Sequence, residues 1–238
     1  MTLSVATEFE YPAHIVWACA AAADRVNGGY RKEAKWDYDP APTDDPSDGF
    51  IELPNNKTMV LRWLEQWRNN LLKKSEVTEQ DATDGAAAQT FWQNQMLLLL
   101  DDKSNEYLRA CVNAAHKEIV NDLLDVAVIA SSITAAKREA RKQALIEKKQ
   151  ALNSEHVHTV GSTMVYEGEF EVIDSRYIDK AGATNVECIV EGNLYTWWSQ
   201  QYVEPGIYHY LKGRVRHHDR DYHTDQPSTK LNYVKVRE

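Results

Sequence analysis

The hydrophobic periodicity of this chain changes near His158. Before that point apolar residues recur at helical spacing, and after it they alternate every second residue, which is typical of strands with one buried face. A chain of 238 residues with 43% hydrophobic content can form two modest domains. The sequence therefore predicts an α+β protein, with a helical N-terminal domain (residues 1–153) followed by a β domain (residues 154–238).

Amphipathic patterns predict most of the helical half. The alanine-rich face of the first helix should let another helix approach closely. Trp63 and Trp67 lie on a leucine stripe and are expected in the core, and the apolar run Met96–Leu100 is expected to be buried on most sides. A stretch rich in Pro, Asp and Gly, residues 28–49, is expected to form a surface loop. The predicted helices cover residues 11–27, 55–74, 86–100 and 104–128, the last beginning at Ser104.

Residues 133–152 differ from the helices before them. They combine strong helix formers with dense charge and few apolar side chains, so an exposed helix that ends the first domain is expected. Its cations outnumber its acids. Two roles fit this composition: a solvated spacer between the domains, or a positive flank beside a binding groove.

Five strand candidates follow, and five strands in a short segment predict a small barrel or sandwich. In the first of them, Glu167, Glu169 and Glu171 share one face, and such an acidic face is unsuited to a phosphate backbone. The candidates are residues 164–178, 184–193, 194–200, 206–218 and 229–237.

The fourth and fifth candidates reverse the charge. Seven Lys or Arg and three Asp or Glu lie between Lys212 and Arg237, although the formal net charge of the chain is −9. Single-stranded nucleic acid stacks its bases on aromatic rings and needs cations for its phosphates, so the segment predicts a local site for it. Strict alternation places on one face of the fourth candidate the residues Tyr208, Tyr210, Lys212, Arg214 and Arg216.

Two sequence patterns sit in these strands. The fourth has Gly206, Tyr208, Gly213 and Val215 in the pattern G-x-Y-x-x-x-x-G-x-V, and the fifth has the pattern T-x-L-x-x-V-x-V from Thr229 to Val236. With the strand order and turns, these patterns resemble the OB-fold, in particular OB modules of phage-encoded proteins of DNA replication and recombination.

The resemblance implies that single-stranded DNA or RNA, with DNA favoured, binds across strands two and three, while the loop between strands four and five closes over it. Strand alternation sends Trp197 and Trp198 to opposite faces and leaves open which of them faces the ligand. The residues that the resemblance assigns to binding are Tyr195, Trp197 and Trp198 on the face, Arg220, Tyr222 and His223 on the loop, and Lys212, Arg214 and Arg216 at the phosphates.

Two other functions compete with nucleic-acid binding. The His and Asp residues of the segment 217–225 have the chemistry of divalent-metal ligands, but a metal-dependent nuclease needs further ligands and a positioned base. A protein-interaction adaptor or inhibitor suits the negative net charge. We expect no catalysis, cofactor or bound metal, and we expect the helical half to contact a protein partner or a second copy of the chain.

The cysteines and the hydropathy indicate the compartment. Cys19, Cys111 and Cys188 are far apart and lack CxxC spacing, so they are expected to be buried and reduced. No membrane-spanning apolar run or secretory signal is recognisable, which predicts a cytoplasmic protein without membrane contact.

Overall fold

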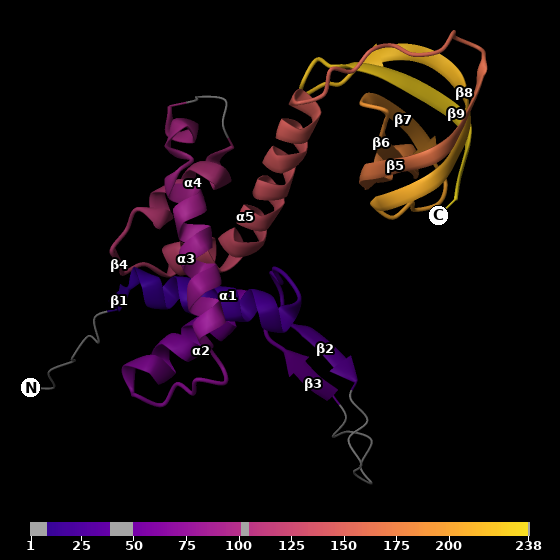
Figure 1. Ribbon diagram of the computed structural model, residues 1–238. Helices are drawn as coiled ribbons and strands as arrows, with labels where there is room; N and C mark the ends of the chain where they lie inside the picture. The colour runs from indigo at the N-terminus through magenta and orange to yellow at the C-terminus, as the bar shows by residue number, and fades with distance from the viewer. Residues whose placement is uncertain (1–8, 39–49, 101–104, 238) are drawn as a thin grey trace, which may run out of the picture. The chain divides into compact units, whose positions relative to one another are not determined.

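The computed structural model describes residues 9–38, 50–100 and 105–237. Within these residues the fold is α+β, with five helices followed by a closed five-stranded β-barrel, as predicted (Figure 1). The chain divides into two compact units, Met1–Ala140 and Arg141–Glu238. The long helix α5, Leu123–Gln150, contributes to both units.

The helical unit is built around α1, Ala13–Asn27, which is buried along most of its length, while His14, Arg25 and Val26 are exposed. It follows Pro12 and ends at Gly28, whose φ of 64° places it in the left-handed region that terminates helices. The unit's other long helices before α5 are α2 (Asn56–Arg68), α3 (Glu79–Gln93) and α4 (Glu106–Ala115).

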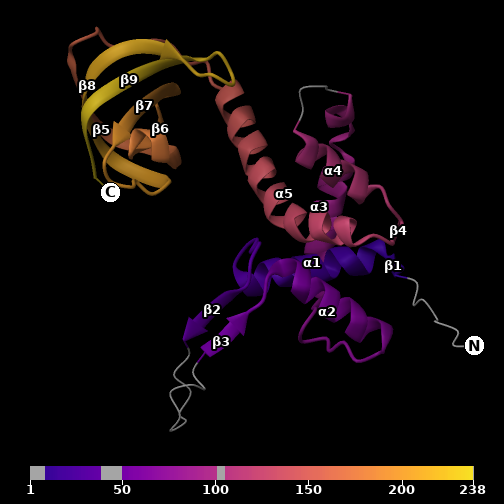
Figure 2. The same ribbon diagram turned by 180° about the vertical axis from the view of Figure 1, so that it is seen from behind.

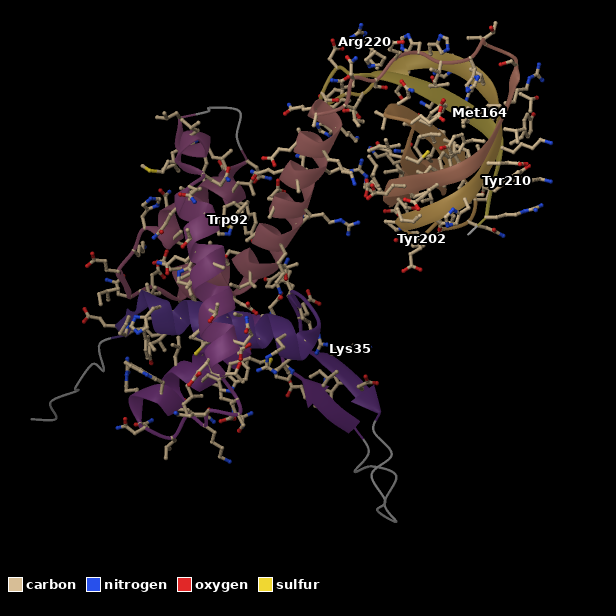
Figure 3. All side chains as sticks on the ribbon, in the orientation of Figure 1. Lys35, Trp92, Met164, Tyr202, Tyr210 and Arg220 are labelled. Carbon is tan, nitrogen blue, oxygen red and sulfur yellow. The ribbon has the colours of Figure 1, made fainter. Side chains whose placement is uncertain are left out.

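Small residues allow α1 and α3 to pack closely. A Cβ atom on Gly85 of α3 would lie 2.6 Å from the backbone carbonyl of Trp17 in α1, so only glycine fits there. The close approach expected of the alanine-rich helix is confirmed. Trp63 is buried in the same core and Trp67 packs against it. Trp92 also lies in the helical unit (Figure 3), and its indole donates a hydrogen bond of 3.1 Å to the carbonyl of Ser132.

The apolar run at the end of α3 differs from its prediction. The helix starts at Glu79, where Thr78 and Asp81 form a capping box, and it ends at Gln93. The run continues as a short 3-10 helix, Met96–Leu99, in which Leu97 is 77% exposed, and Leu100 beyond it is 79% exposed. The expected burial on most sides is therefore wrong, because the helix stops before the run begins.

One predicted helix is divided into three elements. Between α4 and α5 lies the short strand β4, Ile119–Val120, which pairs with β1, Tyr11–Pro12. Asp122 then accepts a hydrogen bond of 2.8 Å from the backbone of Leu124 and begins α5. Ser104, the expected cap of α4, lies outside the described residues, and Asn105 caps that helix.

The expected loop after α1 contains a strand. β2, Lys35–Tyr38, pairs with β3, Phe50–Leu53, in an antiparallel arrangement. Figures 1 and 2 show this hairpin extending from the region where α1 ends. The two aromatic residues in the Lys-Trp-Asp-Tyr stretch favour a strand, and the Pro- and Asp-rich composition of the surrounding segment concealed this preference.

All five predicted strands form, and they close into the barrel in the order β5-β6-β7-β9-β8. Every neighbouring pair is antiparallel except β7 and β9, which are parallel. Met164, Phe170, Leu211 and Leu231 are among the buried residues that fill it. The strands are β5 (Thr163–Ile178), β6 (Ala183–Val190), β7 (Asn193–Ser199), β8 (Gly206–Arg220) and β9 (Pro227–Arg237).

The three cysteines are buried free thiols, as predicted. Burial raises the pKa of Cys19 to about 12 and that of Cys111 to about 11. The pKa of Cys188, in the barrel core, is raised as well. In the described part of the chain, no helix combines the length and hydropathy needed to cross a membrane.

Candidate nucleic-acid interface

The outer face of β8 and β9 is a basic surface, which we call the basic ribbon and define as Lys212, Arg214, Arg216, Lys235 and Arg237. All five side chains are exposed. Lys212 and Lys235 lie directly opposite each other in the antiparallel register. Like charges at such a position destabilise a sheet, and within the described residues no carboxylate forms an ion pair with any of the five. The ribbon is therefore suited to an external anion.

A β-bulge in β9 places an aromatic ring on the ribbon. The register shifts between the Lys212 and Arg214 pairs, so that Tyr233 and Val234 together oppose Gly213. A Cβ on Gly213 would lie 3.2 Å from Leu231 and 3.3 Å from Val234, so the bulge crowds against this glycine.

Tyr233 has an unusual backbone and an exposed side chain. Its φ of 54° is in the left-handed region, which is unfavourable for a bulky residue. The side chain is 84% exposed. Together with Arg214, Arg216 and Asn232 it lines a hollow of about 260 Å³. An exposed ring beside two guanidinium groups is the combination that stacks a base and neutralises its phosphates.

The structure separates the predicted pair of tryptophans. Trp197 is 2% exposed and belongs to the barrel core, whereas Trp198 is 44% exposed. Tyr195 is also in the core, at 3% exposed. Of the three residues predicted on this strand, only Trp198 therefore presents its ring to solvent.

The predicted face of β8 is wrong at its first residue. Tyr208 is buried, and its hydroxyl donates a hydrogen bond of 2.9 Å to the carbonyl of Glu204. Buried and exposed side chains alternate along β8, but this alternation is offset by one residue between Tyr208 and Leu211. The pairing with β5 shifts register at the same place. Tyr210 stays half-buried under the guanidinium of Arg237, 5.0 Å from its ring centroid.

The loop between β8 and β9 carries the remaining predicted residues. Arg220 pairs with Asp225 at 2.9 Å, whereas Tyr222 is 93% exposed and its ring lies 5.2 Å from that of His223. Asp221 folds the loop, because its carboxylate accepts hydrogen bonds from the backbone of His223 and from both the backbone and hydroxyl of Thr224.

Asp221 also joins the loop to α5. The ammonium of Lys149 lies 2.8 Å from Asp221 and pairs with Glu187 of β6, and all three side chains are nearly buried. Burial opposes ionisation of Lys149, but the two carboxylates hold its pKa above the ordinary value. Burial likewise acts to raise the pKa of Asp221, yet hydrogen bonds from Lys149 and Thr224 lower it overall. The loop is thus positioned by a buried ionic cluster.

This cluster corrects the prediction for the charged helix. Residues 133–152 were expected to form an exposed helix. Most of residues 141–150 are exposed, but Lys149 is buried, and so are Ile133, Ala135 and Ala136 at the start of this segment. Lys148 pairs with Glu171 of β5 at 2.5 Å. These cations are therefore neutralised by barrel carboxylates, and the end of the helix covers part of the outer face of β6 at Glu187.

Two histidines of this region stack on each other. The rings of His156 and His218 stack with centroids 4.7 Å apart, and each has a nitrogen within 3.0 Å of a backbone carbonyl oxygen. Among the described residues, no group of three or more His, Cys, Asp or Glu side chains is arranged to hold a metal ion.

Tyr233, Lys235 and Arg237 were missing from the predicted site. The two cations were visible as part of the local charge excess, but their position opposite β8 depends on strand pairing. The exposed ring of Tyr233 depends on the bulge, for which the sequence carries no evident signal.

Comparisons with protein-family models, with curated proteins and with solved structures found no match to this chain. The geometry of the barrel surface is thus the basis for a functional proposal.

Proposed function

We propose that this protein binds single-stranded nucleic acid, with DNA favoured, along the basic ribbon, without catalysis and with little sequence preference. The observation that carries the proposal is the direct opposition of Lys212 and Lys235, without an ion pair among the described residues, beside the exposed ring of Tyr233. A phosphate between the two ammonium groups would relieve their repulsion.

The distribution of charge supports a binding surface limited to one side of the barrel. Glu167 of β5 lies beside Tyr210, and Lys148 and Lys149 of α5 are paired with carboxylates of β5, β6 and the β8–β9 loop. The chain carries a formal net charge of −9, and the basic ribbon is a local positive region within it. Such a region attracts a polyanion without making the whole protein a nonspecific binder.

The strand order supports placing the barrel with the OB-folds. In chain order the strands close as first, second, third, fifth and fourth, with a parallel pair between the third and the fifth. Barrels of this kind bind oligonucleotides on the face of strands two and three and with the loops beside it. The proposed surface differs from that expectation, because the basic ribbon lies on the fourth and fifth strands, while Tyr195 and Trp197 of the third are in the core. A role in phage DNA replication or recombination is the biological setting that we propose on the resemblance of the fourth and fifth strands.

A titration of labelled oligonucleotides tests the function. Fluorescence anisotropy with mixed-sequence single-stranded DNA should show binding that weakens between about 50 and 200 mM salt, with a log–log slope of about −0.7 for each phosphate contacted. Matched RNA and duplex DNA report the preference. Binding that is absent at low salt contradicts the proposal.

Charge reversal locates the site. The double substitution Lys212→Glu with Lys235→Glu should weaken this binding strongly and make the log–log salt slope shallower by about 1.4, the share of two phosphate contacts. The double substitution Arg176→Glu with Lys180→Glu is the matched control, because it changes the net charge equally and both residues are exposed, on β5 and in the turn that follows it. Equal losses in both proteins would show that only the overall charge matters.

A further inference from the structure

The strand β9 has a free backbone edge along its second half. β9 pairs with β8 as far as Arg237, but it pairs with β7 only from Ser228 to Leu231. Within the described residues, no strand pairs with Asn232–Arg237 on the side turned away from β8. The peptide groups on this side are open to a further strand.

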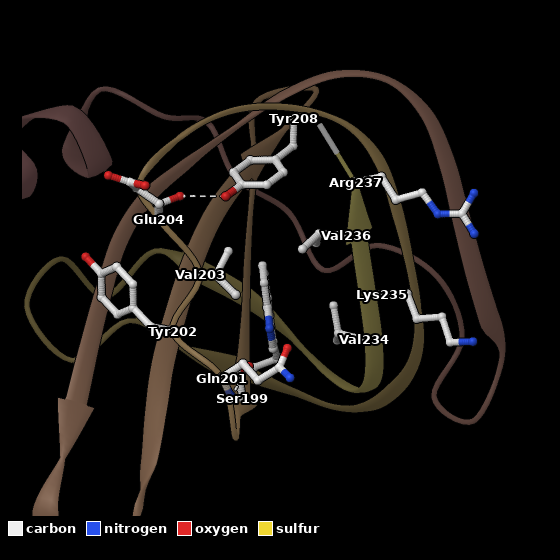
Figure 4. Close-up of a pocket in the computed structure, with 11 residues that line it drawn as sticks. Ser199, Gln201, Tyr202, Val203, Glu204, Tyr208, Val234, Lys235, Val236 and Arg237 are labelled. Carbon is white, nitrogen blue, oxygen red and sulfur yellow. Dashed lines mark hydrogen bonds between the residues drawn. The ribbon is translucent and has the colours of Figure 1, made fainter.

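A cavity of about 550 Å³ opens beside this edge. It lies between β9 and the connector from β7 to β8. Figure 4 shows Val203, Val234 and Val236 directed toward one space, and the ring of Trp197 also lines it. Pockets that enclose ligands typically have volumes of about 300–1,000 Å³, and this cavity is within that range. Its wall along β9 is apolar, and β7 and the connector add Ser199, Gln201 and Glu204 on the other side. The cavity therefore has room for apolar side chains that enter from a segment lying along β9.

The charges that β9 carries beside this edge are positive, whereas the connector across the cavity carries Glu204. Lys235 and Arg237 alternate with Val234 and Val236 and point to the other side of the strand (Figure 4). A strand added to β9 would alternate in the same way, with one set of side chains entering the cavity and the other set beside the cations.

We propose that the edge Asn232–Arg237 and the adjoining cavity bind an extended acidic peptide of a partner protein, which adds to β9 as a strand. Its apolar residues enter the cavity and the acidic residues between them pair with Lys235 and Arg237. Peptide groups are required to continue the hydrogen-bond ladder, and a nucleic acid has none. A second copy of β9 in this place would set Lys235 and Arg237 against the same cations, so charge disfavours self-pairing.

A labelled synthetic peptide tests the proposal without nucleic acid, so the outcome is independent of the proposed function. The probe is a peptide of about eight residues in which Glu alternates with Val or Leu. It should bind the full chain at least about tenfold more tightly than a peptide of the same composition with all Glu residues grouped at one end. A central proline, which removes a backbone donor, should weaken binding by about tenfold. Equal binding of the alternating and grouped peptides would overturn the proposal.

Two further measurements keep the test decisive. The double substitution Lys235→Glu with Arg237→Glu should lose the Glu peptide and gain the corresponding Lys peptide, a gain that an unfolded variant would not show. Hydrogen exchange should slow at backbone amides of Asn232–Arg237 when the peptide binds. Absence of this protection, or a concentration-dependent dimer that the peptide disrupts, would overturn the assignment.

The peptide and the oligonucleotide share Lys235 and Arg237, so they should compete. Addition of the Glu peptide to the protein–oligonucleotide complex should release the oligonucleotide, whereas the grouped peptide should release less at equal concentration. If both ligands bind at the same time with unchanged affinities, they do not share these two cations.

Discussion

The ammonium group of Lys149 lies 2.8 Å from the carboxylate of Asp221, which joins the end of α5 to the loop between β8 and β9. The same ammonium pairs with Glu187, so one buried cation connects a helix, a strand and a loop. Arg220 and Tyr222 flank Asp221 in the chain, and Arg216 of the basic ribbon lies earlier on β8, the strand that ends at Arg220. The buried cluster therefore determines where the loop stands relative to the proposed binding surface.

Removal of the buried cation should destabilise the barrel strongly. Lys149→Met leaves two nearly buried carboxylates without their partner, and breaking a buried pair in this way costs about 3–5 kcal/mol. Urea unfolding measures the change. Lys148→Met is the control, because its exposed pair with Glu171 contributes at most about 1 kcal/mol. Similar losses from the two substitutions would contradict the assigned role of Lys149.

The same cluster predicts a loss of stability in acid. The pKa of Asp221 in the folded protein is below its ordinary value of 3.8, so the unfolded chain binds the proton first as the pH falls. The stabilisation is complete above that ordinary value and is lost as the pH falls toward the folded pKa. Unfolding free energies from about pH 7 to about pH 3 should therefore converge for the wild type and Asp221→Asn. A constant difference between the two curves would disprove the linkage.

Gly85→Ala should destabilise the helical unit although alanine is the better helix former. Alanine gains up to about 1 kcal/mol in helix propensity, but its Cβ would collide with the backbone of Trp17 at 2.6 Å. Overpacking of this kind costs about 1–3 kcal/mol, and more where backbone must move. Thermal unfolding followed by tryptophan fluorescence measures the effect. Thr83→Ala on the exposed face of α3 is the comparison, and a Gly85→Ala protein as stable as that control would refute the packing argument.

Tyr233→Asn should weaken oligonucleotide binding by about 1–3 kcal/mol, the contribution of one stacked ring. Asparagine tolerates the left-handed backbone of this position better than most residues, so the substitution removes the ring without adding strain. The control is Tyr177→Asn, which removes a ring that is 58% exposed on β5. Anisotropy titrations in which both proteins bind equally would exclude Tyr233 from the interface.

The barrel could be predicted because its signals are local. Each strand has its own period-two pattern, and the turns carry their own residues. Glu191 and Gly192 join β6 to β7 with φ values of 47° and 79°, as expected for a two-residue hairpin turn. The division of the predicted helix between α4 and α5 was missed because apolar spacing continues through β4, whose pairing with β1 is a long-range contact.

The site was less predictable because its residues depend on distant partners. Lys149 belongs to a charge-rich helix, and only Glu187 and Asp221, remote in sequence, cause it to be buried. The ring of Tyr233 is exposed because of a bulge, while the ring of Tyr208 is buried because the alternation of β8 changes. A pattern that assumes regular strands cannot place either ring correctly.

The three buried thiols make each unit report its own opening. Cys188 lies in the barrel, and Cys19 and Cys111 lie in the helical unit, so a thiol reagent reaches each one only when its surroundings unfold. A ligand that binds only the folded barrel should therefore slow the labelling of Cys188 while leaving Cys19 and Cys111 unchanged. The native thiols thus report the opening of each unit separately, without an engineered label.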